Sequence, residues 1–187
     1  MQPAGFSPVM TDEEAIRQVQ RGNDDAFSTL VDRYHGSCRR FALRMLDDPT
    51  DADEVVQDTF LRAFRALGRY DHRDRFAAWL MRILINRCRT AARRARKHNA
   101  PLVPLEAASR VEDQATTPGR STEGAEIEAA ITELRPEQRE LFLLRFVERL
   151  SYEEIATVTG VGVSALKMRV LRTRDELRRK LRGEVRE

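Results

Sequence analysis

The sequence predicts an all-α protein of two small helical domains joined by a flexible linker, with a helix-turn-helix in the C-terminal domain. Apolar residues recur at helical spacing along most of the 187 residues, and the alternation typical of strands is nearly absent. Residues 98–123 lose this periodicity and hold three of the seven prolines, which indicates a linker. The expected organisation is an N-terminal tail with a short helix, then two domains separated by the linker. Its boundaries are 1–22, 23–97, 98–123 and 124–187.

Four helices are expected before the linker. A capping box, Thr11 to Glu14, begins the first helix, and Gly22 ends it. Pro49 marks a break before the third helix, whose first turn is rich in the acids that a helix dipole favours. Trp79 lies at a core spacing in the fourth helix, which predicts that it is buried. The expected ranges are 11–22, 23–45, 50–68 and 75–96.

Four further helical segments are expected at 124–134, 136–148, 151–159 and 164–182. Ser151 and Glu154 form a second capping box, with Leu150 and Ile155 as its hydrophobic staple. Gly160 closes this short helix, and Ser164 can cap the long basic helix that follows. A short helix, a glycine-bearing turn and a longer basic helix form the helix-turn-helix pattern, whose second helix reads the DNA major groove. The stripe of this last helix expected to be buried is Leu166, Val170, Leu177 and Leu181.

Charge is segregated along the chain, although the net charge is only +3. Residues 47–58 hold six acids and no base, and residues 82–97 hold seven bases and no acid. Residues 164–187 hold nine bases and four acids. A single charge run is usually a solvated helix face, but two arginine-rich helices in one small chain favour two contacts with a nucleic acid.

The acidic helix also predicts an interface for a protein. On a helical wheel, polar and apolar side chains gather away from the core stripe of residues 50–68. This face suits a protein partner with a basic surface, whereas a solvated helix face explains any one of its acids equally well. Its members are Glu54, Gln57, Asp58, Leu61 and Arg65.

Several other classes of protein are not expected. No apolar run approaches the ~20 residues of a membrane span, and the N-terminus lacks the features of a signal peptide, so we expect a soluble, cytoplasmic protein. Two cysteines are too few for a disulfide framework. His35 and Cys38 could share a helix face, but two ligands do not make a structural zinc site. With no catalytic constellation or phosphate-binding glycine loop, we expect no enzyme, metal or cofactor.

Three motif blocks carry a resemblance to a known family. The first is the segment DADEVVQDTFLRAFR at 51–65, and the second is FAAWL at 76–80 with Ile83 and Asn86. The third joins LRPEQRE at 134–140, SYEEIA at 151–156 and ALKMR at 165–169, with Arg172 and Arg174 after them. In this order, on either side of a linker, the blocks resemble regions 2.2, 2.3 to 2.4 and 4 of the extracytoplasmic-function (ECF) sigma factors of bacterial RNA polymerase, within the sigma-70 family. The resemblance covers residues 24–181.

The resemblance implies a factor that binds core RNA polymerase, directs it to promoters and helps open the DNA. The implied partners are the polymerase, through its beta-prime clamp helices and beta flap, promoter DNA and an anti-sigma factor, with no membrane insertion. The residues implied to bind core polymerase are Asp53, Glu54, Gln57, Asp58, Leu61 and Arg62. Those implied to bind the minus-ten element are Arg69, Tyr70, Phe76, Arg82, Asn86, Arg87, Arg89, Arg93 and Arg94. Those implied to bind the minus-thirty-five element are Ser164, Ala165, Lys167, Met168, Arg169 and Arg172.

The sequence departs from the family pattern at a few DNA-facing positions. Thr90 stands where the family often has Asp, and Ala165 and Met168 stand where it usually has Thr and Ser. Leu171 is expected to be exposed on a face where the family is commonly polar. The alternative interpretation is a dimeric helix-turn-helix regulator that binds operator DNA without polymerase. Because the chain ends near residue 187, without the extra C-terminal domain of some relatives, a separate regulatory protein is expected.

Overall fold

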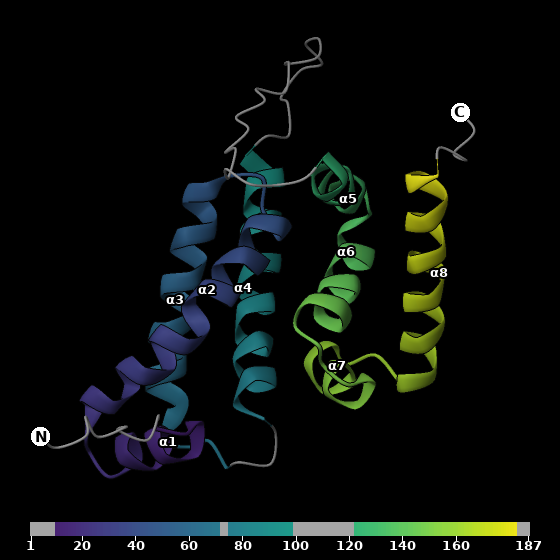
Figure 1. The fold of residues 1–187 in the computed structure, drawn as a ribbon. Coiled ribbons are helices and arrows are strands. Elements are labelled where there is room, and N and C mark those ends of the chain that lie inside the picture. The colour runs from purple at the N-terminus through teal and green to yellow at the C-terminus, as the bar shows by residue number, and fades with distance from the viewer. Residues whose placement is uncertain (1–9, 72–74, 99–121, 183–187) are drawn as a thin grey trace, which may run out of the picture. The chain divides into compact units, whose positions relative to one another are not determined.

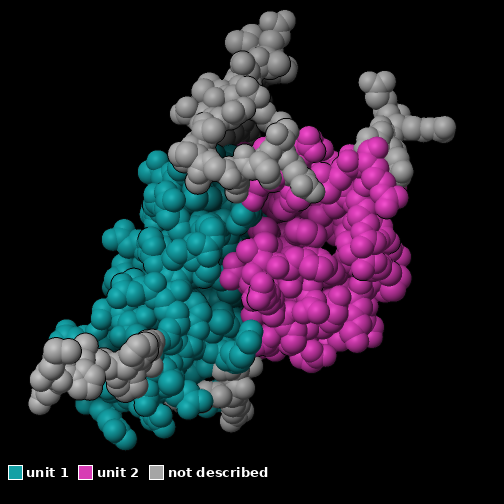
Figure 2. Space-filling model, in the orientation of Figure 1, with its two compact units in different colours: residues 1–89 teal, residues 90–187 magenta. Residues whose placement is uncertain are grey.

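The chain folds into helices, as the sequence predicts. The computed structural model describes residues 10–71, 75–98 and 122–182, and no strand occurs in these ranges. Residues 99–121, most of the expected linker, lie outside the described residues. The chain divides into two compact units, residues 1–89 and 90–187 (Figure 2). Each unit is described by itself below.

The first unit is built from α1 (Asp12–Gln20), the short 3₁₀ helix η1 (Asp24–Ala26), α2 (Phe27–Met45), α3 (Pro49–Leu67) and most of α4 (Phe76–His98) (Figure 1). Each expected helix is present, with its ends within a few residues of the expected ranges. The capping box of α1 is formed, because the Glu14 amide donates to Thr11 Oγ1 at 3.2 Å and the Thr11 amide donates to Glu14 Oε2 at 2.9 Å. Asp48 caps α3 by accepting from the Thr50 amide at 2.7 Å, with Pro49 in the first turn.

The core of this unit lies between helices that are distant in sequence. Leu30 and Phe41 of α2 are buried, as are Val56 of α3 and Leu84 of α4. The side chain of Gln20, at the end of α1, donates to two backbone carbonyls at 3.0 Å each, those of Leu67 and Tyr70. The end of α1 is therefore fixed to the end of α3.

An aromatic cluster surrounds the start of α4. The Phe76 ring lies 5.3 Å from that of Tyr34 and 6.0 Å from that of Tyr70, between ring centroids. The Trp79 ring lies 5.0 Å from Tyr70 and 5.5 Å from Phe76. Tyr70 and Phe76 are buried, whereas Trp79 is only half-buried. The prediction of a buried Trp79 is thus only partly right, because its two neighbours occupy the interior positions.

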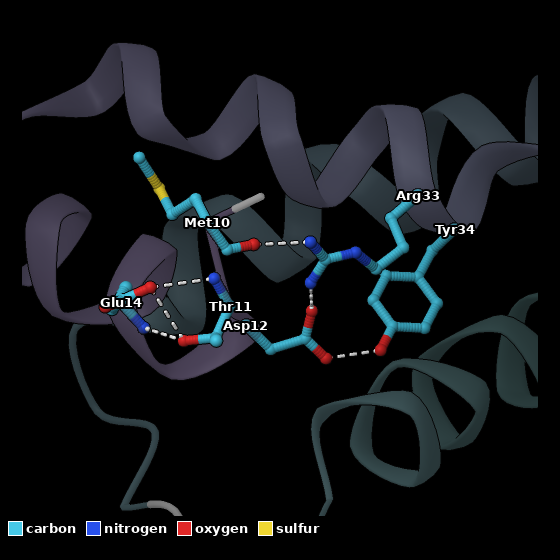
Figure 3. A network of polar contacts seen from close by, with 6 residues as sticks. All are labelled: Met10, Thr11, Asp12, Glu14, Arg33 and Tyr34. Carbon is cyan, nitrogen blue, oxygen red and sulfur yellow. Dashed lines mark hydrogen bonds and ion pairs between the residues drawn. The ribbon is translucent and has the colours of Figure 1, made fainter. Parts of the chain in front are cut away.

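A polar network joins this cluster to the N-terminal helix (Figure 3). The Tyr34 hydroxyl donates to the Asp12 carboxylate, which also pairs with the Arg33 guanidinium. Arg33 in turn donates to the backbone carbonyl of Met10 at 2.5 Å. Burial, followed by the hydrogen bond to Asp12, raises the pKa of Tyr34 well above its usual value. The network fixes the start of α1 to the middle of α2.

The second unit contains α5 (Thr122–Thr132), α6 (Pro136–Phe142), the π-helical turn η2 (Leu143–Val147), α7 (Tyr152–Thr159) and α8 (Val163–Leu181) (Figure 1). The segment 136–148, expected as one α-helix, is therefore an α-helix followed by a π-helical turn. Ser164 was expected to cap the last helix, and this is wrong. Gly162 is the N-cap, without a side-chain hydrogen bond, because α8 already begins at Val163.

The turn of the helix-turn-helix is formed as expected. The Glu154 amide donates to Ser151 Oγ at 3.1 Å, and the Ser151 amide donates to Glu154 Oε2 at 2.7 Å. Leu150 and Ile155, the two residues of the staple, are completely buried. Gly160 ends α7 at φ +73°, a left-handed conformation that favours glycine.

The buried side of α8 is the expected stripe with one correction. Leu166, Val170 and Leu177 are buried, and Thr173 joins them by bonding to the carbonyl of Arg169 at 3.0 Å. Leu181 was expected to be buried and is 45% exposed, because it is the last residue of the helix. The periodicity predicts the direction of a side chain but not where the neighbouring helices stop. Within the described part of the chain, no helix has the length and apolarity needed to cross a membrane.

Candidate functional site

The first candidate surface is the outer face of α3. Most of the residues assigned to it are exposed, and Leu61 keeps 48% of its surface accessible, so the face combines a large apolar side chain with polar ones. Asp58 alone is half-buried. The exposed members are Asp53, Glu54, Gln57, Leu61, Arg62 and Arg65.

A groove of about 990 Å³ runs between α3 and α2 beside this face. Asp53, Gln57 and Leu61 of the predicted face line it. Its other lining residues are not among those that the sequence assigns to this face. Its floor is aromatic, since the Phe27 ring lies 5.2 Å from Phe64 and 6.4 Å from Phe60. The remaining lining residues are Asp24, Asp25, Ser28, Val31, His35 and Arg39.

The groove has different charges at its two ends. Near one end, Arg39 Nε donates to Asp53 Oδ1 at 2.6 Å, and this hydrogen bond lowers the pKa of Asp53. At the other end, Asp24 and Asp25 are exposed acids at the start of η1. Phe27 and Arg39 are twelve positions apart in α2, a rise of about 18 Å. The groove is therefore long enough for about three turns of a helix with an apolar face. Its acidic end, at Asp24 and Asp25, favours a cationic side chain of such a helix.

Asp58 joins two of the predicted surfaces. Its carboxylate pairs with Arg62 Nε at 2.9 Å within α3, and it also pairs with the guanidinium of Arg87 on α4. The family resemblance implies a protein partner for Asp58 and DNA for Arg87, with no link between the two residues. In the folded chain the single Asp58 carboxylate is paired with two guanidinium groups, so Asp58 does not present a free negative charge to a partner and the three residues together keep one positive charge.

The exposed face of α4 carries the second candidate surface. Arg82, Asn86, Arg89 and Arg93 are all exposed and lie at i, i+4, i+7 and i+11, so they follow one side of the helix. Arg94 is exposed as well, on a different side. A row of arginines around one amide can hold a sugar–phosphate backbone and one polar base edge.

The aromatic residues assigned to the same DNA contact lie elsewhere. Tyr70 is 8% exposed and Phe76 is 3% exposed, because both rings belong to the interior aromatic cluster. In this conformation neither ring offers a face on which a base could stack. Arg69, directly before Tyr70, is exposed.

The third candidate surface is the first half of α8. The residues assigned to it are all exposed and lie opposite or beside the buried stripe. Lys167 Nζ lies 5.7 Å from the centroid of the Tyr152 ring, and the Arg145 guanidinium lies 4.9 Å from the same centroid. These cation–π contacts hold Lys167 near the start of α7. The surface consists of Ser164, Ala165, Lys167, Met168, Arg169 and Arg172, with Leu171 at 41% exposure among them.

The fold does not bring His35 and Cys38 together as a pair of metal ligands. His35 lies on the groove and Cys38 is completely buried, so the two do not face a common space. Cys88 is buried as well. Among the residues that the structure describes, no three histidine, cysteine or acidic side chains gather as metal ligands would.

The fold has two helical units: the first contains a helix with a row of exposed arginines and a helix beside an aromatic groove, and the second contains a helix-turn-helix, an arrangement typical of DNA-binding transcription factors. Residues 30–98 match the Sigma-70 region 2 family, and residues 124–177 match the Sigma-70 region 4 family. The chain belongs to the ECF sigma factors of the sigma-70 family.

Similar proteins cover nearly the whole chain. It is 33% identical over 186 residues to the RNA polymerase sigma-H factor of Pseudomonas aeruginosa, covering 94% of this chain and 96% of that protein. It is 28% identical over 182 residues to the ECF RNA polymerase sigma factor SigW of Bacillus subtilis, covering 91% and 96%. Among solved structures, CnrH in complex with the cytosolic domain of CnrY is similar, with a TM-score of 0.69, 29% identity and coverage of 93% and 99%.

Proposed function

We propose that this sigma factor uses three separate surfaces, one for the polymerase and two for promoter DNA. The chain is an alternative sigma factor: it binds core RNA polymerase, directs it to specific promoters and helps open the DNA for initiation. We assign residues 23–97 to region 2 and residues 124–187 to region 4, with 98–123 as the linker and 1–22 as an N-terminal tail with a short helix. A dimeric regulator acting without polymerase is not favoured, since both regions match sigma factors.

The core polymerase surface consists of the outer face of α3 together with the groove beside it. The single observation that carries this assignment is the exposed Leu61 at the rim of an aromatic groove, between the polar Gln57 and Arg62. A partner helix can bury Leu61 and the groove floor while its polar residues meet Asp53, Glu54 and Gln57. Asp58 contributes indirectly, because its ion pairs with Arg62 and Arg87 orient those arginines.

The minus-ten surface is the exposed face of α4. Arg82, Arg89 and Arg93 follow one side of the helix and are suited to successive phosphates, with Asn86 between them as the base-reading candidate. Arg69 and Arg94 extend the cationic area. Tyr70 and Phe76 support this surface from the interior, so a base that leaves the stack would meet the half-exposed Trp79 rather than either of them.

The minus-thirty-five surface is the first half of α8, docked in the major groove as helix-turn-helix proteins dock. Lys167 and Arg172 lie on the outward arc and can reach bases, whereas Arg169 lies nearer the buried side and is better placed for phosphates. Ser164 and Ala165, in the first turn, approach the groove most closely.

The remaining proposals concern the protein's location, its lack of catalytic activity and a further protein partner. We place the protein in the cytoplasm, without catalytic activity of its own, since the polymerase performs the chemistry. An anti-sigma factor is a further proposed partner. A sigma factor RpoE of Bartonella quintana, 25% identical to this chain with a TM-score of 0.67, has been solved in complex with the anti-sigma factor NepR.

An electrophoretic shift assay with and without core polymerase tests the proposed function. The sigma assignment predicts weak binding of a promoter fragment by the chain alone and tight, specific binding with core polymerase present. A two-fold operator bound equally tightly without polymerase would contradict it and restore the dimeric regulator.

A further inference from the structure

Two large apolar side chains occupy the middle of the outward face of α8. Met168 is 50% exposed and Leu171 is 41% exposed. At about 100° per residue, Met168 lies nearly opposite the buried stripe of Leu166, Val170 and Leu177, and Leu171 lies one turn further along the same side. Scattered exposed apolar residues are common on protein surfaces, but these two are adjacent and central.

Cationic side chains flank this apolar centre on both sides. On the helical wheel Lys167 lies on one flank and Arg172 lies on the other, and both are exposed. The contact between Lys167 and the Tyr152 ring holds the lysine toward α7 and away from the middle of the face. An apolar centre with cationic side chains beside it fits the DNA major groove: the apolar pair meets the base edges in the centre, and the neighbouring cations can reach adjacent base edges or the phosphates of the rims.

The major groove presents one apolar group, the 5-methyl of thymine. We propose that Met168 and Leu171 read thymine methyl groups in the upstream promoter element and so set its sequence. Residues three apart on a helix have their Cβ atoms about 5–6 Å apart, and base pairs rise about 3.4 Å. The two side chains therefore reach thymines on neighbouring or next-neighbouring base pairs, on either strand. The methionine side chain is flexible and polarizable, so Met168 can adjust its position to reach a thymine methyl group.

The same face shows where the contact ends. Asp175, one turn after Leu171, is an exposed carboxylate on the outward side, paired with Arg174 at 3.5 Å. A carboxylate at that position repels phosphates, so α8 leaves the groove after about Arg172. Base reading is thereby limited to the first two to three turns, where Met168 and Leu171 are the only large apolar side chains exposed in the described α8 before Leu181.

The proposal rests on the assignment of α8 to the upstream element, and the experiment separates the two. The full-length chain with core polymerase is used to select promoters from a library randomised at the upstream element. Each thymine in the selected element, on either strand, is then replaced singly by uracil, which lacks only the methyl group. Competition binding of the holoenzyme measures the effect of each replacement.

We expect one or two thymines at which uracil weakens binding about fourfold, which corresponds to about 0.8 kcal/mol for one buried methyl-sized group. This sensitivity should disappear in Met168→Gln or Leu171→Gln, each at its own position. Leu181→Gln is the matched control: this leucine, 45% exposed on the same helix, lies beyond the proposed contact, so the variant should keep the full sensitivity to uracil.

Three results would overturn the proposal. They are a selected element without thymine, tolerance of uracil at every position, and sensitivity that persists when Met168 and Leu171 are both replaced by glutamine. If the holoenzyme binds promoters but selects no upstream element at all, the assignment of α8 itself is wrong and the proposal falls with it. Circular dichroism and binding to core polymerase show whether each variant is folded.

Discussion

Truncating Leu61 to alanine tests the polymerase surface most directly. Fully burying a leucine side chain contributes about 1.5–3 kcal/mol. Leu61 keeps 48% of its surface exposed in the free chain, so about half of that contribution, about 0.7–1.4 kcal/mol, is available to a partner. Leu61→Ala should therefore weaken core polymerase binding about three- to tenfold.

The assay is a fluorescence anisotropy titration of the labelled full-length chain with core polymerase. Leu181→Ala is the control, because Leu181 has a similar exposed fraction, 45%, but lies at the end of α8 in the other unit. The control should bind core polymerase as the unchanged chain does. A folded Leu61→Ala variant that binds within twofold of the unchanged chain would refute the assignment of the α3 face and its groove.

Three further changes test other parts of the structure. Asp58→Lys should lower the free energy of unfolding by about 1–2 kcal/mol, because two ion pairs become repulsions. Glu54→Lys, at an exposed acid one turn earlier, should cost less than about 0.5 kcal/mol, and equal losses in urea unfolding would contradict the network. Gly160→Ala should destabilise the chain by about 1–2 kcal/mol, since φ is +73° with open space around the position, and an unchanged midpoint would show that the turn can relax. Tyr34→Phe should remove part of the loss of stability above about pH 10. Because the fold raises the pKa of Tyr34, the native state holds its proton more tightly than the unfolded state, so this contribution is complete below that pH and declines above it. Urea unfolding of the unchanged chain and of the Tyr34→Phe variant, at neutral pH and near about pH 10.5, measures how much free energy of unfolding each loses between the two pH values. An equal loss in both would count against the hydrogen bond to Asp12.

The features that the sequence alone determined are those that close within one or two helical turns. Both capping boxes formed as predicted, since each needs only a side chain and an amide three residues apart. Gly160 ended its helix in the left-handed conformation for a local steric reason. The exposed face of α3, with Leu61 in it, and the exposed Leu171 followed from helical periodicity. Helix existence and the direction of most side chains were therefore predictable.

The tertiary structure decided what those faces meet. The groove requires Phe27 and Phe64, which are 37 positions apart, and nothing local places their rings 5.2 Å from each other. The pairing of Asp58 with Arg87 unites two charge blocks that looked independent. Tyr70 and Phe76 became interior residues because Tyr34 packs against Phe76, and Leu181 became exposed because it is the last residue of α8. A helical wheel predicts the angle of a side chain, but its burial depends on where other helices begin and end, and only long-range packing determines that.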